Sequence, residues 1–189
     1  MAVREITVVG HRALHQRTKR VREVTDEIRT LVADLFDTME AAEGVGLAAN
    51  QVGARLRIFV YDCPVPDGPH ARGVVINPVL ERLGTPAPLD PEEDGEGCLS
   101  VPAEYFPLAR HPGARVTGTD LDGNQVVVAG RGLLARCLQH ETDHLEGQLY
   151  VDRLAGAYRR EAREAIKDRG WAEDGVTKWD PSSTKADEV

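Results

Sequence analysis

Two histidines stand four residues apart in the segment QHETDHLEG, residues 139–147, with a glutamate beside the first. On a helix of about 3.6 residues per turn, side chains four positions apart lie on one face, one turn from each other. The imidazoles of His140 and His144 can therefore reach one metal ion, and Glu141 can act as a base beside it. The alternative interpretation is a polar stretch of helix without a ligand.

A third ligand is needed, because two histidines hold a metal weakly and a catalytic site usually takes three protein ligands. One zinc-protease pattern has a histidine six residues after the second, but this chain has Tyr150 at that position. Another pattern takes a glutamate about twenty residues downstream, and Glu161 or Glu164 would serve there. Spacing alone leaves this second pattern open.

Cysteine is the other candidate for the third ligand. Cys137 shares the helix face of the histidines, but helical side chains lean toward the N-terminus, so its short thiol should line a pocket or the core instead. Cys63 follows a predicted strand in YDCPVP and is interpreted as a buried thiol. Cys98 stands in EGCLS after an acidic loop, where its thiolate and the neighbouring backbone amides could face a ligand. The sequence therefore favours Cys98.

These residues must be held by regular elements. Residues 132–146 predict a helix that carries both histidines and ends at Gly147, a residue typical of helix C-termini. An amphipathic helix is predicted at residues 25–42 with Thr25 as its N-cap, and a third helix at 158–167. Strands are predicted at 55–62 and 74–80, and a hairpin at 114–120 and 125–129 around Asp122 and Gly123. The predicted fold class is α+β, with a mostly antiparallel sheet packed around the central helix that carries HExxH.

Length and composition indicate one globular domain. The chain has 189 residues, of which 41% are hydrophobic and 29% charged, enough to bury a core. No apolar run approaches the roughly 20 residues of a membrane span, and the N-terminus lacks the apolar core of a signal peptide. The net charge of -8 argues against general nucleic-acid binding. Three cysteines cannot all pair within the chain, which favours a reducing compartment, by default the cytoplasm.

Two further segments carry less specific signals. In GVGLAANQ, residues 44–51, Gly44, Gly46 and Ala49 match a dinucleotide-binding fingerprint, but that motif follows a strand and opens a helix, the reverse of the order here. The chain becomes polar after Trp171, which predicts a frayed terminus. We therefore expect a catalytic domain at residues 1–169 and a polar, flexible tail at 170–189. Trp171 and Trp179 are most simply packing residues.

Three motifs together resemble those of the peptide deformylases: GVGLAANQ, EGCLS and QHETDH, in this order and at this spacing. The similarity covers about residues 8–154. It implies removal of the formyl group from the N-terminal formylmethionine of newly synthesised proteins. It also implies one divalent metal per chain, typically Fe²⁺ with Ni²⁺, Co²⁺ or Zn²⁺ as substitutes. N-formylmethionyl nascent polypeptides are the implied partners, and an association with the ribosome stays open.

The resemblance also implies roles for individual residues. Cys98, His140 and His144 would be the metal ligands, and Glu141 would move a proton from water to the departing amine. A side-chain amide and a backbone N–H would stabilise the oxyanion, those of Gln51 and Leu99. The implied substrate pocket draws on Val45, Gly46, Gly97, Leu133 and Cys137.

Two other functional classes stay open beside this one. A zinc endoprotease would use the same helix with a carboxylate as third ligand, and a noncatalytic metal-binding module would need neither Glu141 nor Gln51. Thr142, Arg136 and Tyr105 differ from the residues usual in the family near the cleft. These differences leave the ligands untouched, but they leave the shape and polarity of the methionine pocket undetermined.

A ligating histidine usually has its second ring nitrogen held by a partner. The acidic residues Glu96 and Asp143 lie within the motifs themselves, and Arg110 follows as a counter-charge. We therefore expect a pair between Arg110 and one of these carboxylates to brace the metal-binding segments.

Overall fold

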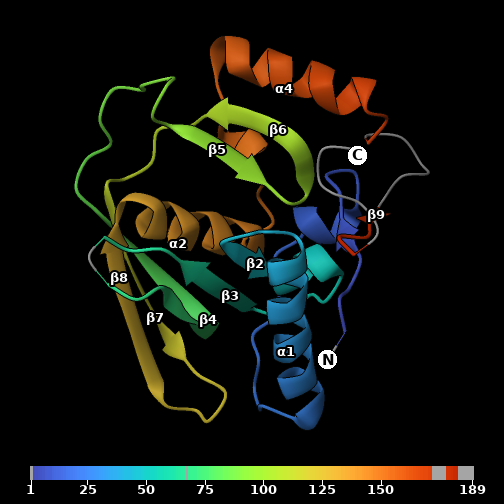
Figure 1. The fold of residues 1–189 in the computed structure, drawn as a ribbon, viewed down its shortest axis with the longest axis vertical. Helices are drawn as coiled ribbons and strands as arrows, with labels where there is room; N and C mark the ends of the chain where they lie inside the picture. Colours follow the sequence, from blue (N-terminus) through green and yellow to red (C-terminus); the bar gives the residue numbers. More distant parts are fainter. Residues whose placement is uncertain (1, 67, 172–177, 183–189) are drawn as a thin grey trace.

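The computed structural model describes residues 2–66, 68–171 and 178–182. The central feature is the helix α2, which lies between a five-stranded sheet and the hairpin β5–β6 (Figure 1). The helices are η1 (Arg12–His15), α1 (Asp26–Ala41), η2 (Ala49–Val52), α2 (Gly132–Leu145), α3 (Tyr150–Arg153) and α4 (Gly156–Asp168). The strands are β1 (Ile6–Thr7), β2 (Gly46–Ala48), β3 (Ile58–Cys63), β4 (Ala71–Leu83), β5 (Gly95–Cys98), β6 (Val101–Pro107), β7 (Gly113–Thr119), β8 (Gln125–Arg131) and β9 (Lys178–Trp179).

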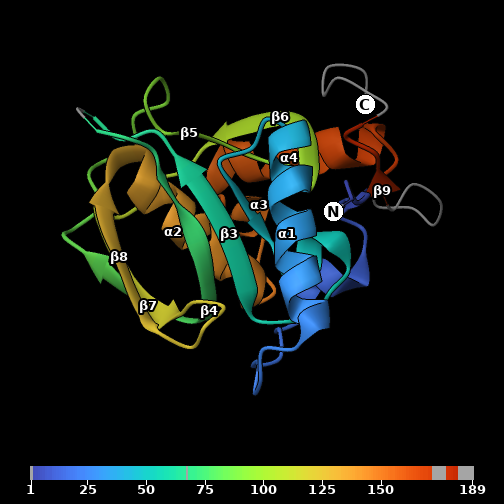
Figure 2. The same cartoon turned by 60° about the horizontal axis from the view of Figure 1, so that its bottom comes forward.

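The sheet has the order β2-β3-β4-β7-β8, with every neighbouring pair antiparallel. Its register shifts between Ile76 and Val79 of β4, where Asn77 has a φ of 55°. The Asn77 side chain accepts from the Val21 N–H at 2.9 Å and donates to the Val21 carbonyl at 2.8 Å, which anchors this irregularity. Figure 2 shows the sheet curving around α2. The predicted antiparallel sheet around a central helix is confirmed.

Helix α2 is buried over most of its length, which is why polar side chains on it can face a closed site. Its apolar side chains Leu134, Leu138 and Leu145 form one core with Phe59 and Val116 of the sheet. Each such buried side chain contributes about 1.5–3 kcal/mol. The helix ends before Gly147, whose φ is 76° and where a Cβ would lie 2.8 Å from the Gln16 backbone. Gly147 is thus required by both backbone conformation and space.

The other predicted elements are present with shifted ends. The structure has α1, α4 and the hairpin β7–β8 where the sequence predicts them. Thr25 occupies the N-cap position of α1 as predicted, although its side chain makes no capping bond to the backbone. The first predicted strand begins only at Ile58, because Leu56 forms an isolated bridge with Lys19. The hairpin β5–β6, which has the EGCLS motif at the end of β5 and in the turn, was not predicted.

The C-terminal segment differs from the expected frayed tail. Trp179 of β9 pairs with Ile6 of β1, and its side chain is buried, as is that of Trp171. For residues 178–182 the frayed-tail prediction is therefore wrong. Burial of the indole against the domain offsets the entropic cost of ordering a polar segment. Residues 172–177 and 183–189 lie outside the described residues, and the domain boundary at residue 169 stays a prediction. No helix in the described ranges is long and apolar enough to cross a membrane.

Candidate metal and catalytic site

Three side chains from two elements converge at the centre of the molecule. Cys98 ends β5, and His140 and His144 project from adjacent turns of α2. The Cys98 Sγ lies 3.2 Å from the His144 Nε2, which lies 3.1 Å from the His140 Nε2. The possible ligand atoms of the three all lie within 4.8 Å of one another. We call these three residues the donor group.

The donor group fits a divalent transition metal. The His140 Nδ1 lies 2.7 Å from the Glu96 Oε1, so it carries the proton and leaves the Nε2 lone pair free. A thiol sulfur and two imidazole nitrogens thus face one another in a buried place. One sulfur and two nitrogens are a donor set suited to zinc, iron, nickel or cobalt, and a cation there would relieve the mutual repulsion of their lone pairs.

The other candidates for a third ligand lie elsewhere. The thiols of Cys137 and Cys63 both donate to the Val45 carbonyl, at 3.4 and 3.5 Å. Glu161 and Glu164 are exposed on α4. Among the acidic and cysteine side chains of the described residues, Cys98 is therefore the one that meets both histidines. Tyr150, where one protease pattern has a histidine, stacks on the His140 ring with 6.2 Å between ring centroids.

Glu141 presents an unpaired carboxylate beside the donor group. The residue is 3% exposed, and its Oε2 has no hydrogen-bond partner among the described residues. A Cβ at position 46 would lie 2.5 Å from the Glu141 Oε1, so Gly46 makes room for the carboxylate. Burial raises the pKa of Glu141 to about 7. A carboxyl group with such a pKa can both take and return a proton near neutral pH.

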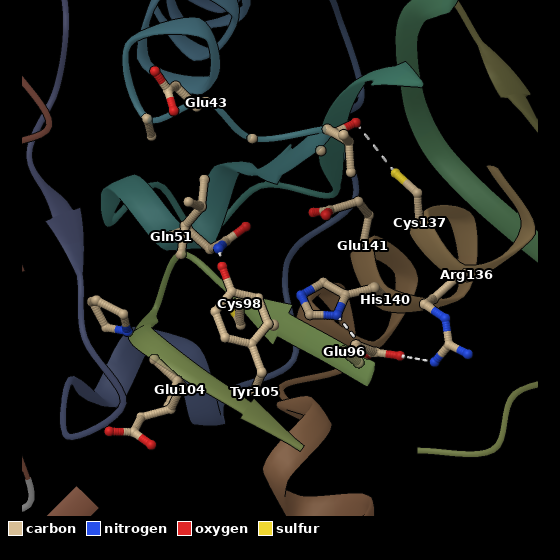
Figure 3. A pocket seen from close by; sticks show the side chains of 18 of the residues that line it. Glu43, Gln51, Glu96, Cys98, Glu104, Tyr105, Arg136, Cys137, His140 and Glu141 are labelled. Carbon is tan, nitrogen blue, oxygen red and sulfur yellow. Dashed lines mark hydrogen bonds and ion pairs between the residues drawn. The ribbon is translucent and has the colours of Figure 1, made fainter. Parts of the chain in front are cut away.

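The side chain of Gln51 is oriented by its own oxygen. Its Oε1 accepts from the Ala48 N–H at 2.8 Å, which directs the Nε2 toward the Ser100 Oγ at 3.2 Å. The Nε2 also faces the Cys98 Sγ at 3.8 Å (Figure 3). Leu99 follows Cys98 and lines a cavity beside the donor group. A donor fixed in this way needs no reorganisation when a negative charge develops next to it.

A set of paired charges lies directly behind the donor group. Arg110 donates to both oxygens of Glu96, at 2.9 and 2.6 Å, and to the Asp143 Oδ2 at 2.5 Å. We expected one of these two contacts, and the structure has both. Burial opposes the charge of Glu96, but Arg110 and His140 outweigh it and hold its pKa well below the usual range. The side chains of Arg110, Glu96 and Asp143 are all at most 6% exposed.

Two further arginines complete this set. Arg136 donates to the Glu96 Oε2 at 3.0 Å, and Arg153 donates to both oxygens of Asp143, at 2.6 and 2.5 Å. We call the five residues Glu96, Arg110, Arg136, Asp143 and Arg153 the ionic cluster. Arg136 was singled out only for differing from the residue usual in the family, and the cluster explains its place.

Thr142 is accommodated within the buried helix α2. Its hydroxyl donates to the Leu138 carbonyl one turn earlier, at 2.8 Å. The polar atom is thereby satisfied without any partner from the site. The difference from the usual apolar residue therefore leaves the donor group unaffected.

A cavity of about 480 Å³ opens beside the donor group. Its volume lies in the range typical of small-molecule sites. A Cβ at Gly97 would lie 2.4 Å from the ring of Tyr105, so a glycine is needed for that ring to close one wall. All residues assigned to the substrate pocket from the sequence line this cavity: Val45, Gly46, Gly97, Leu133 and Cys137.

Three residues near the site were missed or misjudged from the sequence. Ser100 meets the Gln51 amide, Glu43 lines the cavity with a φ of 53°, and Trp179 lines it from the C-terminal strand. Glu43 and Ser100 adjoin recognised motifs, so proximity to a motif was an available signal. For Trp179 the only signal was a large aromatic residue within a polar segment.

Comparisons with known proteins agree with this geometry. A model of the polypeptide deformylase family matches residues 3–160. A peptide deformylase from Rhodococcus opacus is 51% identical over 190 residues, 98% of this chain and 96% of the relative. A solved peptide deformylase from Ehrlichia chaffeensis in complex with actinonin is 34% identical, with a TM-score of 0.81, covering 93% of this chain and 100% of that one. One from Synechococcus elongatus, also with actinonin, is 39% identical, with a TM-score of 0.76, covering 90% and 88%. A buried thiol and two imidazoles beside a free carboxylate, on a chain related over nearly its whole length, lead to one conclusion: the chain belongs to the peptide deformylase family.

Proposed function

We propose a deformylation mechanism in which each residue of the site has a defined role. The chain, as a peptide deformylase, is a hydrolase that removes the formyl group from N-terminal formylmethionine. The observation that carries the assignment of roles is the meeting of the donor group with the unpaired carboxylate of Glu141 and the oriented amide of Gln51.

Cys98, His140 and His144 would hold one divalent metal. The convergence of their sulfur and nitrogen atoms supports this, as does the Glu96 carboxylate on the His140 Nδ1. When bound, such a metal supplies a Lewis acid, which acidifies water and withdraws electron density from a carbonyl oxygen. This mixed donor set suits Fe²⁺, Ni²⁺, Co²⁺ and Zn²⁺ alike. We propose Fe²⁺ as the physiological metal, with the other three as substitutes, because the resemblance to the peptide deformylases implies it.

Glu141 would carry the proton through the reaction. It takes a proton from the attacking water as the oxygen bonds to the formyl carbon. It then delivers that proton to the amine nitrogen as the C–N bond breaks, which releases formate and a free N-terminus. The raised pKa of Glu141 and its unpaired oxygen support this role.

Two donors would stabilise the oxyanion that forms on the formyl oxygen. They are the Nε2 of Gln51 and the backbone N–H of Leu99. The fixed orientation of the Gln51 amide supports its role, because its Oε1 is held by the Ala48 N–H and its Nε2 faces the sulfur of the donor group. Loss of one such donor commonly costs about 3 kcal/mol of transition-state stabilisation.

The cavity would receive the methionine side chain, and the backbone of β5 would bind the peptide. Among the described strands, β5 pairs only with β6, so its other edge is available to an extended chain. Gly97 would offer its backbone groups there, while Val45, Gly46, Leu133 and Cys137 surround the side chain. We further propose that the chain acts in the cytoplasm, because its three cysteines are free thiols.

Formate release from a formyl-Met peptide by anaerobically purified, iron-loaded protein tests this function. We expect one formate per new N-terminus, and no reaction with an acetyl-Met peptide of the same sequence. A fully loaded protein that releases no formate would contradict the proposal. Cleavage of internal peptide bonds would instead support the endoprotease.

We also propose that the chain meets its substrates, N-formylmethionyl nascent polypeptides, at the ribosome. Sedimentation with ribosomes at low and physiological salt checks this association. Absence from the ribosome fraction at both salt concentrations would contradict it and leave the reaction itself untouched.

A further inference from the structure

A tryptophan from the C-terminal strand contacts the motif that supplies the donor-group thiol. The indole Nε1–H of Trp179 donates to the Leu99 carbonyl at 2.8 Å, across 80 positions of sequence. Trp179 is 6% exposed and lines the cavity of the site. A hydrogen bond from a buried side chain to this particular carbonyl is more specific than packing requires.

The Leu99–Ser100 peptide has partners at both of its ends. Its carbonyl accepts from the indole of Trp179, and its N–H, on Ser100, donates to the Cys98 Sγ at 3.4 Å. In a trans peptide these two groups point in opposite directions. The peptide therefore links the indole on one side to the sulfur on the other, and hydrogen bonds in such a chain strengthen one another.

The same pair of short strands also reaches the other proposed oxyanion donor. Trp179 pairs with Ile6, and the adjacent Thr7 donates from its hydroxyl to the Gln51 carbonyl at 3.0 Å. Thr7 is fully buried, so this contact is shielded from water. The strands β1 and β9 thus hold the backbones of Gln51 and Leu99, which come from separate segments of the chain.

We propose that Trp179 is a positioning residue for the Cys98–Ser100 segment. Its indole N–H fixes the Leu99–Ser100 peptide, which keeps the Ser100 N–H on the Cys98 sulfur and the Leu99 backbone in its place beside the cavity. This proposal rests on the proposed function for the roles of Cys98 and Leu99. Groups that hold a metal ligand in place commonly affect metal affinity or activity by about 10- to 100-fold.

The variant Trp179→Phe keeps an aromatic ring and removes the donor. We expect Co²⁺ affinity, measured by competition with a chelator, to fall by about tenfold or more. We expect the Ser100 amide of the metal-free protein to exchange its hydrogen faster, and kcat to fall more than KM changes. Trp171→Phe makes the same substitution at another buried indole, at the end of α4, and should leave all three quantities at parental values.

The metal affinity and amide exchange need no formylated peptide, so they test the positioning role even if the chain fails to release formate. Parental Co²⁺ affinity and Ser100 exchange in a folded Trp179→Phe protein would overturn the proposal. A variant that only melts at a lower temperature would overturn it too, because Trp179 would then be a packing residue. If the variant does not fold, exchange in the parental protein decides: a Trp179 indole N–H that exchanges freely overturns the proposal, and slow exchange supports it.

Discussion

The two groups of polar side chains that meet at α2 are satisfied differently. In the ionic cluster, both carboxylates accept from guanidinium groups on each of their oxygens. Around the donor group, the Glu141 Oε2 and the His144 Nδ1 have no partner among the described residues. A buried polar group without a partner costs about 1–3 kcal/mol. Two of the four buried side-chain atoms that lack a partner among the described residues thus belong to this region, and the proposed reaction would use one of them, the Glu141 Oε2.

The ionic cluster and the donor group are also joined by a hydrogen bond. The Glu96 carboxylate accepts from Arg110 and from the His140 Nδ1, so the same oxygens neutralise an arginine and orient a proposed ligand. This hydrogen bond of 2.7 Å therefore connects the two groups. If this comparison holds, changes in the ionic cluster should act on stability first, and changes around the donor group on metal binding and rate.

The largest effect is expected from Cys98→Ala. Removing the sulfur leaves two imidazoles, which hold a divalent metal weakly, so stoichiometric metal binding and formate release should both be lost. Metal content after dialysis, measured by atomic absorption, checks this. Cys63→Ala changes a buried thiol outside the donor group and should keep its metal. Full occupancy in the Cys98 variant would break the assignment of the donor group.

Glu141→Gln should give the next largest effect, on rate alone. It removes the group that takes and returns a proton, a role worth about 10² to 10⁴ in kcat, while the metal ligands stay intact. Gln51→Ala should cost about 10² to 10³ by removing an oxyanion donor. Formate release is compared with metal content and melting temperature for each variant. A metal-loaded Glu141→Gln protein that works at the parental rate would remove the proposed proton carrier.

Arg110→Ala should act mainly on stability. It deprives two buried carboxylates of a shared partner, and breaking such a buried pair typically costs about 3–5 kcal/mol. Urea unfolding of the metal-free protein measures this loss. The exposed pair Arg115–Glu81, at 3.3 Å, is the control, and Glu81→Ala should change stability by less than about 0.5 kcal/mol. Equal small losses of stability at both positions would show that the ionic cluster stabilises the fold no more than an exposed ion pair does.

The smallest effect is expected at an ion pair far from the site. Asp34 on α1 accepts from Arg4 at 2.9 and 2.7 Å, and although burial opposes its charge, Arg4 outweighs this and lowers the pKa of Asp34. A lowered folded-state pKa means that the pair stabilises the fold above the unfolded-state pKa, about 3.9, and less as pH falls below it. Asp34→Asn should therefore cost about 1 kcal/mol at pH 7 and less at pH 3, by urea unfolding. A cost that does not shrink on acidification would contradict the sign. Asp37→Asn, on the same helix, is the control.

Local chemistry fixed the parts of the site that lie on single elements. The spacing of His140 and His144 decides their common face through helix geometry alone, and Gly147 ends that helix because few other residues adopt its φ of 76°. The same holds for the hairpin at Gly123, whose φ is 81°. These features depend on backbone conformation within a few residues, so they could be predicted without knowing the fold.

The role of Cys98 could be predicted from the sequence only in part. Its motif favoured it as the third ligand, but Glu161 and Glu164 stayed open on spacing alone. The decision came from the hairpin β5–β6, whose pairing carries the sulfur to within 3.2 Å of the His144 Nε2. A contact across 46 positions of sequence depends on how a hairpin packs against a helix, and the local pattern contains no record of that packing.

The remaining features were decided by tertiary structure alone. Arg110 was expected to meet one carboxylate and meets two, because Glu96 on β5 and Asp143 on α2 both lie within hydrogen-bond distance of its guanidinium. The segment around Trp179 has the composition of a loose tail, but pairing with Ile6 buries the indole and gives it a carbonyl to bind. Composition measures the average tendency of a segment to be solvated. Whether one large side chain in it finds a buried partner depends on surfaces that form only when distant parts of the chain have folded together.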